Sequence, residues 1–202
     1  MGLPGQALAE QAIGAREPSP GEILFEFVGK LTQDGAQFAG FGYLTRLIGV
    51  GPGGLFSDPA QASEATAHFT FASRATLTGR SHLHNLEVLD ADGELVIHHR
   101  ATPGASFDDP ASFSTGRRVA AYAVHYESVV TAQTADEGSE QLRARLSQQE
   151  VVPFWAEGRR HRLGAVGDRL AVDANGWSQR TSAIGPQSQA WVAGIASFLG
   201  GS

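Results

Sequence analysis

Polar and apolar residues alternate with a period of two through much of the chain. In residues 64–71 every even-numbered position is polar and every odd-numbered position is apolar. Successive side chains of a β-strand point to opposite faces, so this pattern predicts a strand with one polar and one apolar side. In residues 80–89, Arg80, His82 and His84 share one side. Titratable groups therefore line up along the predicted sheet.

The same pattern, bounded by turn residues, predicts strands over most of the sequence: 22–31, 37–50, 64–76, 79–90, 94–100, 117–134, 141–154, 159–163 and 169–174. The pairs Asp34-Gly35, Asp92-Gly93 and Asn175-Gly176 favour tight turns, because these residues tolerate positive φ. Segments 51–63 and 101–114 are rich in glycine, proline and serine and are predicted to be long loops. Residues 141–154 have helix-like leucine spacing, but their place between two strands favours a strand.

These elements predict an all-β fold, a single antiparallel β-barrel of about eight strands. Residues 1–20 are expected to form a flexible N-terminal arm, ended by Pro18 and Pro20. The barrel domain is assigned to residues 21–184. Residues 185–202 are interpreted as a tail with a short amphipathic helix, whose apolar face would carry Trp191, Ile195, Phe198 and Leu199.

Composition narrows the classes of function. The net charge of −6, with 15 basic and 21 acidic residues, argues against nucleic-acid binding. The basic run at 159–162 is interpreted as a solvated strand end. The chain has no cysteine, no run long enough to cross a membrane as a helix, and no secretory pattern at its start. We therefore expect a cytoplasmic protein without a membrane partner. The sequence is compatible with a homo-oligomer and does not fix the oligomeric state.

Glycines in the segment 49–54 (GVGPGG) invite comparison with a phosphate-binding loop. No helix is predicted after them, the lysine of a Walker loop is absent, and Pro52 removes a backbone donor. We interpret this segment as a hinge or lid at the barrel mouth.

Three stretches carry a resemblance to a known family: FDDPASFSTG (107–116), VAAYAVHYESVVTAQ (119–133) and FWAEGRRHRLGAVGDRLAV (154–172). In the third, Phe154, Gly158, Leu163, Gly164 and Gly167 follow a glycine-spaced cadence. About half of the chain thus resembles calycin-like barrels of the allene oxide cyclase and dirigent type. The resemblance implies a barrel that encloses a hydrophobic small molecule, as in bacterial cyclases of polyketide-like substrates. No catalytic residue of such an enzyme can be matched to a position of this sequence.

Histidines and one carboxylate are the candidates for acid–base chemistry, because a neutral imidazole transfers protons near pH 7. The predicted catalytic residues are His68, His82, His84, His125 and Glu127. The predicted substrate-binding residues are Phe25, Phe27, Phe41, Tyr43, Phe69, Phe71, Arg80, Tyr122, Tyr126 and Trp155. This set contains a conflict, since Tyr122 and Tyr126 lie on the opposite strand face from His125.

The function predicted from these residues is a cofactor-independent cyclase or isomerase of secondary metabolism, acting on a hydrophobic, polyketide-like substrate without a metal. A non-catalytic carrier of the lipocalin type is one alternative. A cupin-like metalloenzyme using His82 and His84 is another, although alternation is expected to place Glu87 on the face opposite both histidines. The alternation alone does not state which strand face points into the barrel.

Overall fold

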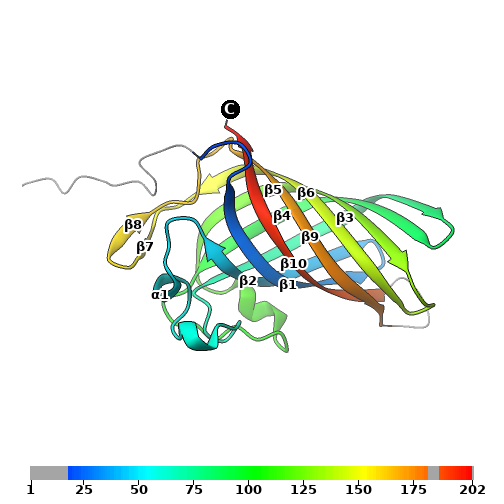
Figure 1. The fold of residues 1–202 in the computed structure, drawn as a ribbon, viewed down its shortest axis with the longest axis horizontal. Helices are drawn as coiled ribbons and strands as arrows, with labels where there is room; N and C mark the ends of the chain where they lie inside the picture. The colour runs from blue at the N-terminus through cyan, green and yellow to red at the C-terminus, as the bar shows by residue number, and fades with distance from the viewer. Residues whose placement is uncertain (1–17, 182–186, 202) are drawn as a thin grey trace, which may run out of the picture.

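Eight antiparallel strands close into one barrel in the computed structural model, which describes residues 18–181 and 187–201 (Figure 1). The strands of the barrel are β1 (Ile23–Asp34), β2 (Gln37–Leu47), β3 (Phe69–Leu83), β4 (Leu86–His99), β5 (Arg117–Ala132), β6 (Glu137–Val151), β9 (Arg169–Arg180) and β10 (Gln187–Gly200). Each of these strands pairs with the next barrel strand along the chain, which for β6 is β9, and β10 pairs with β1 to close the ring. The predicted barrel is thereby confirmed, including β6 in the ambiguous segment.

Shorter elements occupy the connections. Strands β7 (Phe154–Ala156) and β8 (Arg159–His161) form a separate hairpin between β6 and β9. The two predicted long loops contain helix α1 (Pro52–Leu55) and the 3-10 turns η1 (Pro59–Gln61) and η2 (Pro110–Ser114). Most of the predicted N-terminal arm, residues 1–17, lies outside the described residues.

No helix in the described part of the chain has the length and apolar character needed to cross a membrane.

The expected C-terminal helix is wrong, because residues 187–200 form strand β10. Trp191, Ile195 and Leu199 are spaced by four, and residues four apart share a face in a strand as well as in a helix. The period of two in the whole segment decides the structure, since Val192, Ala196 and Phe198 alternate with these residues and are buried. β10 pairs with β9 on one side and with β1 on the other, so its backbone N–H and C=O groups have hydrogen-bond partners on both sides.

Two predicted turns are also wrong. Asp92-Gly93 lies inside β4 and Asn175-Gly176 lies inside β9. At both glycines a Cβ atom would collide with the carbonyl oxygen of a neighbouring strand, Arg74 O and Trp191 O respectively. These glycines therefore permit close strand packing and are not turn residues. The turn between β3 and β4 instead follows Leu83, whereas the predicted turn at Gly35, with φ 60°, is confirmed.

The direction of each strand face follows from the pairing register. On β5, Tyr122, Val124, Tyr126 and Ser128 point into the barrel, where their cross-strand partners on β6 are also buried. The odd-numbered residues between them face outward. The main apolar core fills the barrel interior and continues into the loop between β2 and β3, where it includes Leu55 and Phe56.

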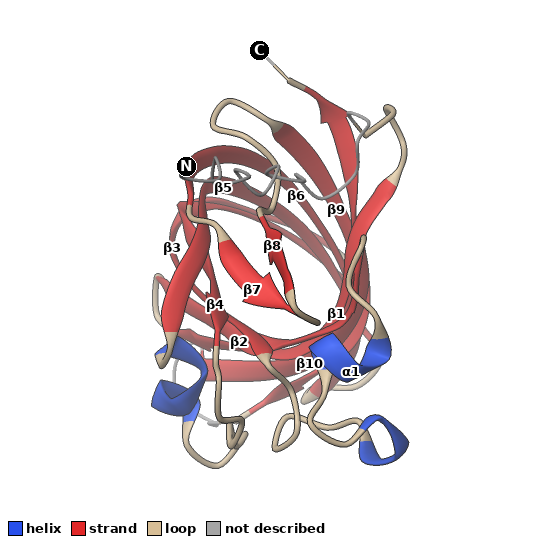
Figure 2. Ribbon diagram, turned by 90° about the vertical axis from the view of Figure 1, so that its left-hand side faces the viewer, coloured by secondary structure: helices blue, strands red, loops and turns tan. Residues whose placement is uncertain are grey.

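The hairpin of β7 and β8 lies across one end of the barrel, as Figure 2 shows from that side. Phe154 packs against Phe69 at 5.1 Å, His99 at 5.5 Å and His161 at 5.6 Å between ring centroids. Gln148, 1% exposed, donates from its amide to the carbonyl oxygen of Leu163 at 2.5 Å, just beyond the hairpin. We call the end of the barrel that this hairpin covers the closed end.

Aromatic rings fill the barrel next to the closed end because glycines opposite them leave room. Phe27 and Phe71 meet edge to face at 5.5 Å. The ring of Phe71 lies over the paired residues Gly29 and Gly42. A Cβ atom at Gly42 would approach Gly29 Cα to 2.6 Å and Phe71 Cε1 to 2.8 Å.

We expect Gly42→Ala to lower the free energy of unfolding by about 1–3 kcal/mol, because it overpacks this layer. Urea unfolding followed by circular dichroism measures the change. Gly53→Ala is the matched control, since a Cβ atom there has its nearest neighbour at 4.0 Å. Equal stability of the two variants would show that the layer has spare volume.

Candidate functional site

The other end of the barrel is open and holds a cavity of about 440 Å³. Figure 1 shows the hairpin of β3 and β4 extending beyond the other strands at this end. The apolar residues of its wall include Leu31, Phe38, Leu89, Val130 and Ala190. The polar residues include Gln33, Arg80, His82, Glu87, Glu140, Ser178, Arg180 and Ser188. Its volume is that of a small-molecule site.

Glu140 is the buried carboxyl group of this cavity. It lies on the inward face of β6, opposite Val130 and Gly176, and is 8% exposed. The hydroxyl of Ser128 donates to Glu140 Oε1 at 2.8 Å. Burial raises the pKa of the Glu140 carboxyl, and the hydrogen bond from Ser128 offsets part of that rise. A carboxyl group that holds its proton can donate a hydrogen bond to a ligand.

A small recess of about 30 Å³ continues the cavity toward the barrel centre. Glu140 and Ser128 border it together with Tyr126 and Ser73. The hydroxyl of Tyr126 donates to Ser73 Oγ at 3.0 Å, and burial raises the pKa of Tyr126 to about 12. Tyr126 is therefore a neutral hydroxyl group at the inner end of the site.

Charged residues of β3 and β4 form one side of the rim. Arg80 Nε lies 2.6 Å from Glu87 Oε1, and His82 Nε2 lies 3.7 Å from the same oxygen. The pairing register places His82 directly opposite Glu87, so the expectation that Glu87 faces away from His82 is wrong. The error arises because β3 and β4 are two strands of one hairpin, and residues opposite each other share a face.

The predicted catalytic histidines do not come together. His82 is at the rim of the cavity, and His84 is exposed in the β3–β4 turn with φ 56°. His68 directly precedes β3, at the closed end, where its Nδ1–H can donate to Arg100 O at 2.8 Å. The length of β3, 15 residues at about 3.3 Å each, separates His68 from His82 by roughly 45 Å.

His125 and Glu127 lie on the outer face of β5, so the expectation that they line the cavity is wrong. His125 Nδ1 is 2.7 Å from Asp92 Oδ1, and His125 Nε2 is 3.9 Å from Glu127 Oε1. The cause is the volume of the large tyrosines: with Tyr122 and Tyr126 inside, the residues between them must point out. The structure resolves the conflict in the predicted set in favour of the tyrosines.

The predicted substrate-binding residues divide into three groups. Arg80 lines the cavity and Tyr126 lines its recess. Five others are packed in the barrel core and are absent from the lining of the cavity: Phe25, Phe27, Phe69, Phe71 and Tyr122. The remaining three lie outside the barrel interior: Phe41, Tyr43 and Trp155.

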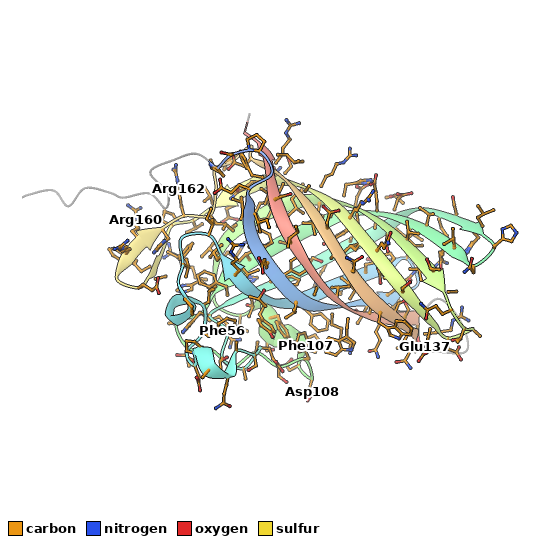
Figure 3. The ribbon with its side chains drawn as sticks, viewed as in Figure 1. Phe56, Phe107, Asp108, Glu137, Arg160 and Arg162 are labelled. Atoms are coloured by element: carbon orange, nitrogen blue, oxygen red, sulfur yellow. The ribbon has the colours of Figure 1, made fainter. Side chains whose placement is uncertain are left out.

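Phe41 and Tyr43 are covered on the outer wall by the loop that precedes β5. Phe41 packs against Phe113 at 5.4 Å and against Phe107 at 6.1 Å between ring centroids. Figure 3 shows Phe107 against the barrel wall, and it shows Glu137 at the open end, far from Arg160 and Arg162 on the hairpin. Trp155 is 64% exposed on that hairpin.

Sequence reasoning missed Glu140, although the sequence contains a signal for it. The inward face of β6 reads Glu140, Leu142, Ala144 and Leu146, so one carboxyl group interrupts an apolar face. A charged residue at a core position requires a partner or a function. The predicted strand 141–154 begins one residue after Glu140, whereas β6 begins at Glu137.

Within residues 18–181 and 187–201, no three or more histidine, aspartate or glutamate side chains stand together as a metal site. This part of the chain therefore contains no set of metal ligands of the kind that the cupin-like alternative requires.

Comparison with protein-family models, with curated proteins and with solved structures gave no match. The structure supports the barrel itself, and the likeness to allene oxide cyclase and dirigent barrels stays a prediction.

We expect Glu140→Gln to gain stability relative to the wild type as the pH rises from 4 to 8. The folded chain binds the Glu140 proton more tightly than the unfolded chain. In the wild type, this proton therefore contributes its full amount to the free energy of unfolding below about pH 4.3. The contribution is lost as the pH rises through the raised pKa. Glutamine has no proton to lose. Urea unfolding at both pH values measures the difference.

Glu127→Gln, which removes a carboxylate from the outer face, controls for the loss of one negative charge. A Glu140→Gln difference that stays constant or shrinks with rising pH contradicts the assignment of a raised pKa.

Proposed function

We propose that the protein is a cofactor-independent cyclase or isomerase that binds a small organic molecule in the open end of the barrel and uses Glu140 as its proton donor. One observation carries this proposal: a buried carboxyl group with a raised pKa lies on the wall of a cavity of about 440 Å³. Buried carboxyl groups of this kind serve as general acids near neutral pH.

The charges around the cavity favour a neutral ligand. Arg80 and Arg180 contribute +2, and Glu87, Asp136 and Glu137 contribute −3, which gives −1 when Glu140 is protonated. Arg80 is already paired with Glu87. An anionic ligand gains little from such a rim, whereas a neutral ligand with a carbonyl oxygen can accept a hydrogen bond from Glu140. A polyketide-like molecule has this chemistry.

The chemical step needs no group beyond the chain. In a cyclisation of the aldol type, Glu140 gives its proton to a carbonyl oxygen of the ligand, the π bond of that carbonyl breaks, and a second ligand carbon bonds to the carbonyl carbon. In an isomerisation the same proton transfer accompanies a shift of the double bond to the adjacent pair of carbons. The resulting carboxylate keeps the hydrogen bond from Ser128, and it recovers a proton from the ligand carbon as the product forms. Proton count is therefore unchanged, as isomerisation and cyclisation require. The wall of the barrel contributes by holding one reactive conformer.

A carrier without turnover is the second candidate. It is favoured by the position of the other titratable side chains: His82 lies at the rim with its side chain 63% exposed, far from a deep ligand. The carrier and the enzyme share the cavity and the same neutral ligand, and they differ in what Glu140 does.

We expect wild-type protein to bind the neutral fluorescent probe N-phenyl-1-naphthylamine saturably, and Ala132→Trp to weaken binding at least about tenfold by filling the mouth. Ala123→Trp is the matched control, because Ala123 is on the same strand but faces outward, opposite Glu94 and Ser147. Probe fluorescence measures both. Equal weakening by the two variants, or none, contradicts a ligand site in the open end.

For turnover, linear 1,3-diketones that displace the probe are the test compounds. We expect Glu140→Gln to retain their affinity and to lower the rate of product formation by about 10²–10⁴-fold, the usual contribution of a general acid. Product formation is followed by chromatography. Binding without conversion by the wild type supports the carrier, and equal rates in both proteins exclude Glu140 as the acid.

A further inference from the structure

A second hollow, of about 460 Å³, lies where β4 ends and β5 begins. It is separate from the open-end cavity, since no residue lines both. We call it the arginine cleft; its residues are His99, Arg100, Ala101, Thr102, Thr115, Gly116 and Arg117. His99 contacts Phe154 of the hairpin, which places the cleft at the closed end of the barrel.

The arginine cleft is positively charged in an acidic protein. The chain has a net charge of −6, yet two arginines and no acidic residue line the cleft. The neighbouring Arg118 is neutralised by Glu94 at 3.2 Å and Glu150 at 3.1 Å. Arg117 is exposed and has none of the ion pairs found within the described residues. A local excess of positive charge attracts anions.

Arg100 is held in place before any ligand arrives. Its backbone N–H donates to His68 O at 2.8 Å, and the ring Nδ1 of His68 is 2.8 Å from Arg100 O. Its Nη1 donates to Ser112 O at 3.1 Å. Gly116, with φ 99°, leaves space for the side-chain stem, because a Cβ atom there would lie 2.7 Å from Arg100 Cγ. The remaining guanidinium N–H groups stay available as donors.

The behaviour of His99 agrees with this positive field. Burial lowers the pKa of His99 first, and the nearby charges of His68 and Arg117 lower it further.

We propose that the arginine cleft binds the oxyanion group of a small molecule, a phosphate or a carboxylate, between Arg100 and Arg117. Guanidinium groups present paired N–H donors that match the oxygens of either anion. This site is independent of the function proposed for the open end of the barrel, so either can stand without the other.

The first experiment titrates the ¹⁵N-labelled full chain with inorganic phosphate at pH 7 and constant ionic strength, followed by NMR. We expect saturable shifts of the Gly116 and Arg117 amides and of the Arg100 and Arg117 Nε–H groups, with a dissociation constant of about 1 mM or tighter. The ring of His125, on the outer wall, should not move. A parallel titration with acetate distinguishes the sources: tighter phosphate binding assigns a phosphoryl group, and tighter acetate binding a carboxylate.

Variants test which residues bind the anion. Arg117→Gln is expected to weaken phosphate binding at least about tenfold, and Arg100→Gln by a similar factor. Arg145→Gln is the matched control, since Arg145 is an exposed arginine on the outer face of β6. Because Arg117 is exposed, its variant tests the site even if Arg100→Gln unfolds. Shifts that never saturate, or equal losses in Arg117→Gln and Arg145→Gln, overturn the proposal.

Discussion

Pairing between the first and last strands of the barrel is the constraint on which the rest of the structure depends. β1 and β10 align from Ile23 opposite Ser197 to Asp34 opposite Gln187, and this seam leaves neither strand with an open edge in the ring. In a closed ring every strand must keep its inward face, because a slip of one residue would exchange its faces. The seam therefore fixes which side chains share the interior.

An interior of eight strands is just wide enough for side chains, so residue size determines where space remains. Next to the closed end, large aromatic side chains fill the interior, with Phe27, Phe71 and Tyr122 among them. Toward the open end several inward positions are small, with Ser178, Ala190 and Ala132 lining the cavity. The hollow is thus a result of residue size along the strands. Its buried carboxyl group is tolerated because burial favours the neutral form.

The two ends of the barrel differ in charge as well as in how fully side chains occupy the interior. The open end combines a nearly balanced rim with a buried acid, which suits a neutral ligand. The closed end has the arginine cleft, where Arg100 is fixed by His68 and Ser112 and Arg117 lies beside it. His68, predicted to act in catalysis, instead supports the backbone of this cleft.

Much of the fold could be predicted from the sequence, because a period of two is a direct consequence of strand geometry. The period of two does not state which face of a strand points into the barrel. The alternation of β5 fits His125 inside as well as Tyr126 inside, and only the packing of neighbouring strands determines which of the two faces inward. Spacing by four made β10 resemble a helix for a similar reason. Of the predicted site residues, Arg80 and His82 line the cavity and Tyr126 lines its recess. Glu140 required knowledge of which face of β6 is buried.

The most direct test of this account is a ¹³C NMR titration of the side-chain carboxyl carbon of Glu140 in the folded protein. Because burial on the cavity wall disfavours the ionised form of this carboxyl group, we predict a midpoint above the ordinary glutamate value of about 4.3. A midpoint at or below that value would contradict the raised pKa of Glu140, and it would remove the proton donor on which the proposed chemistry depends.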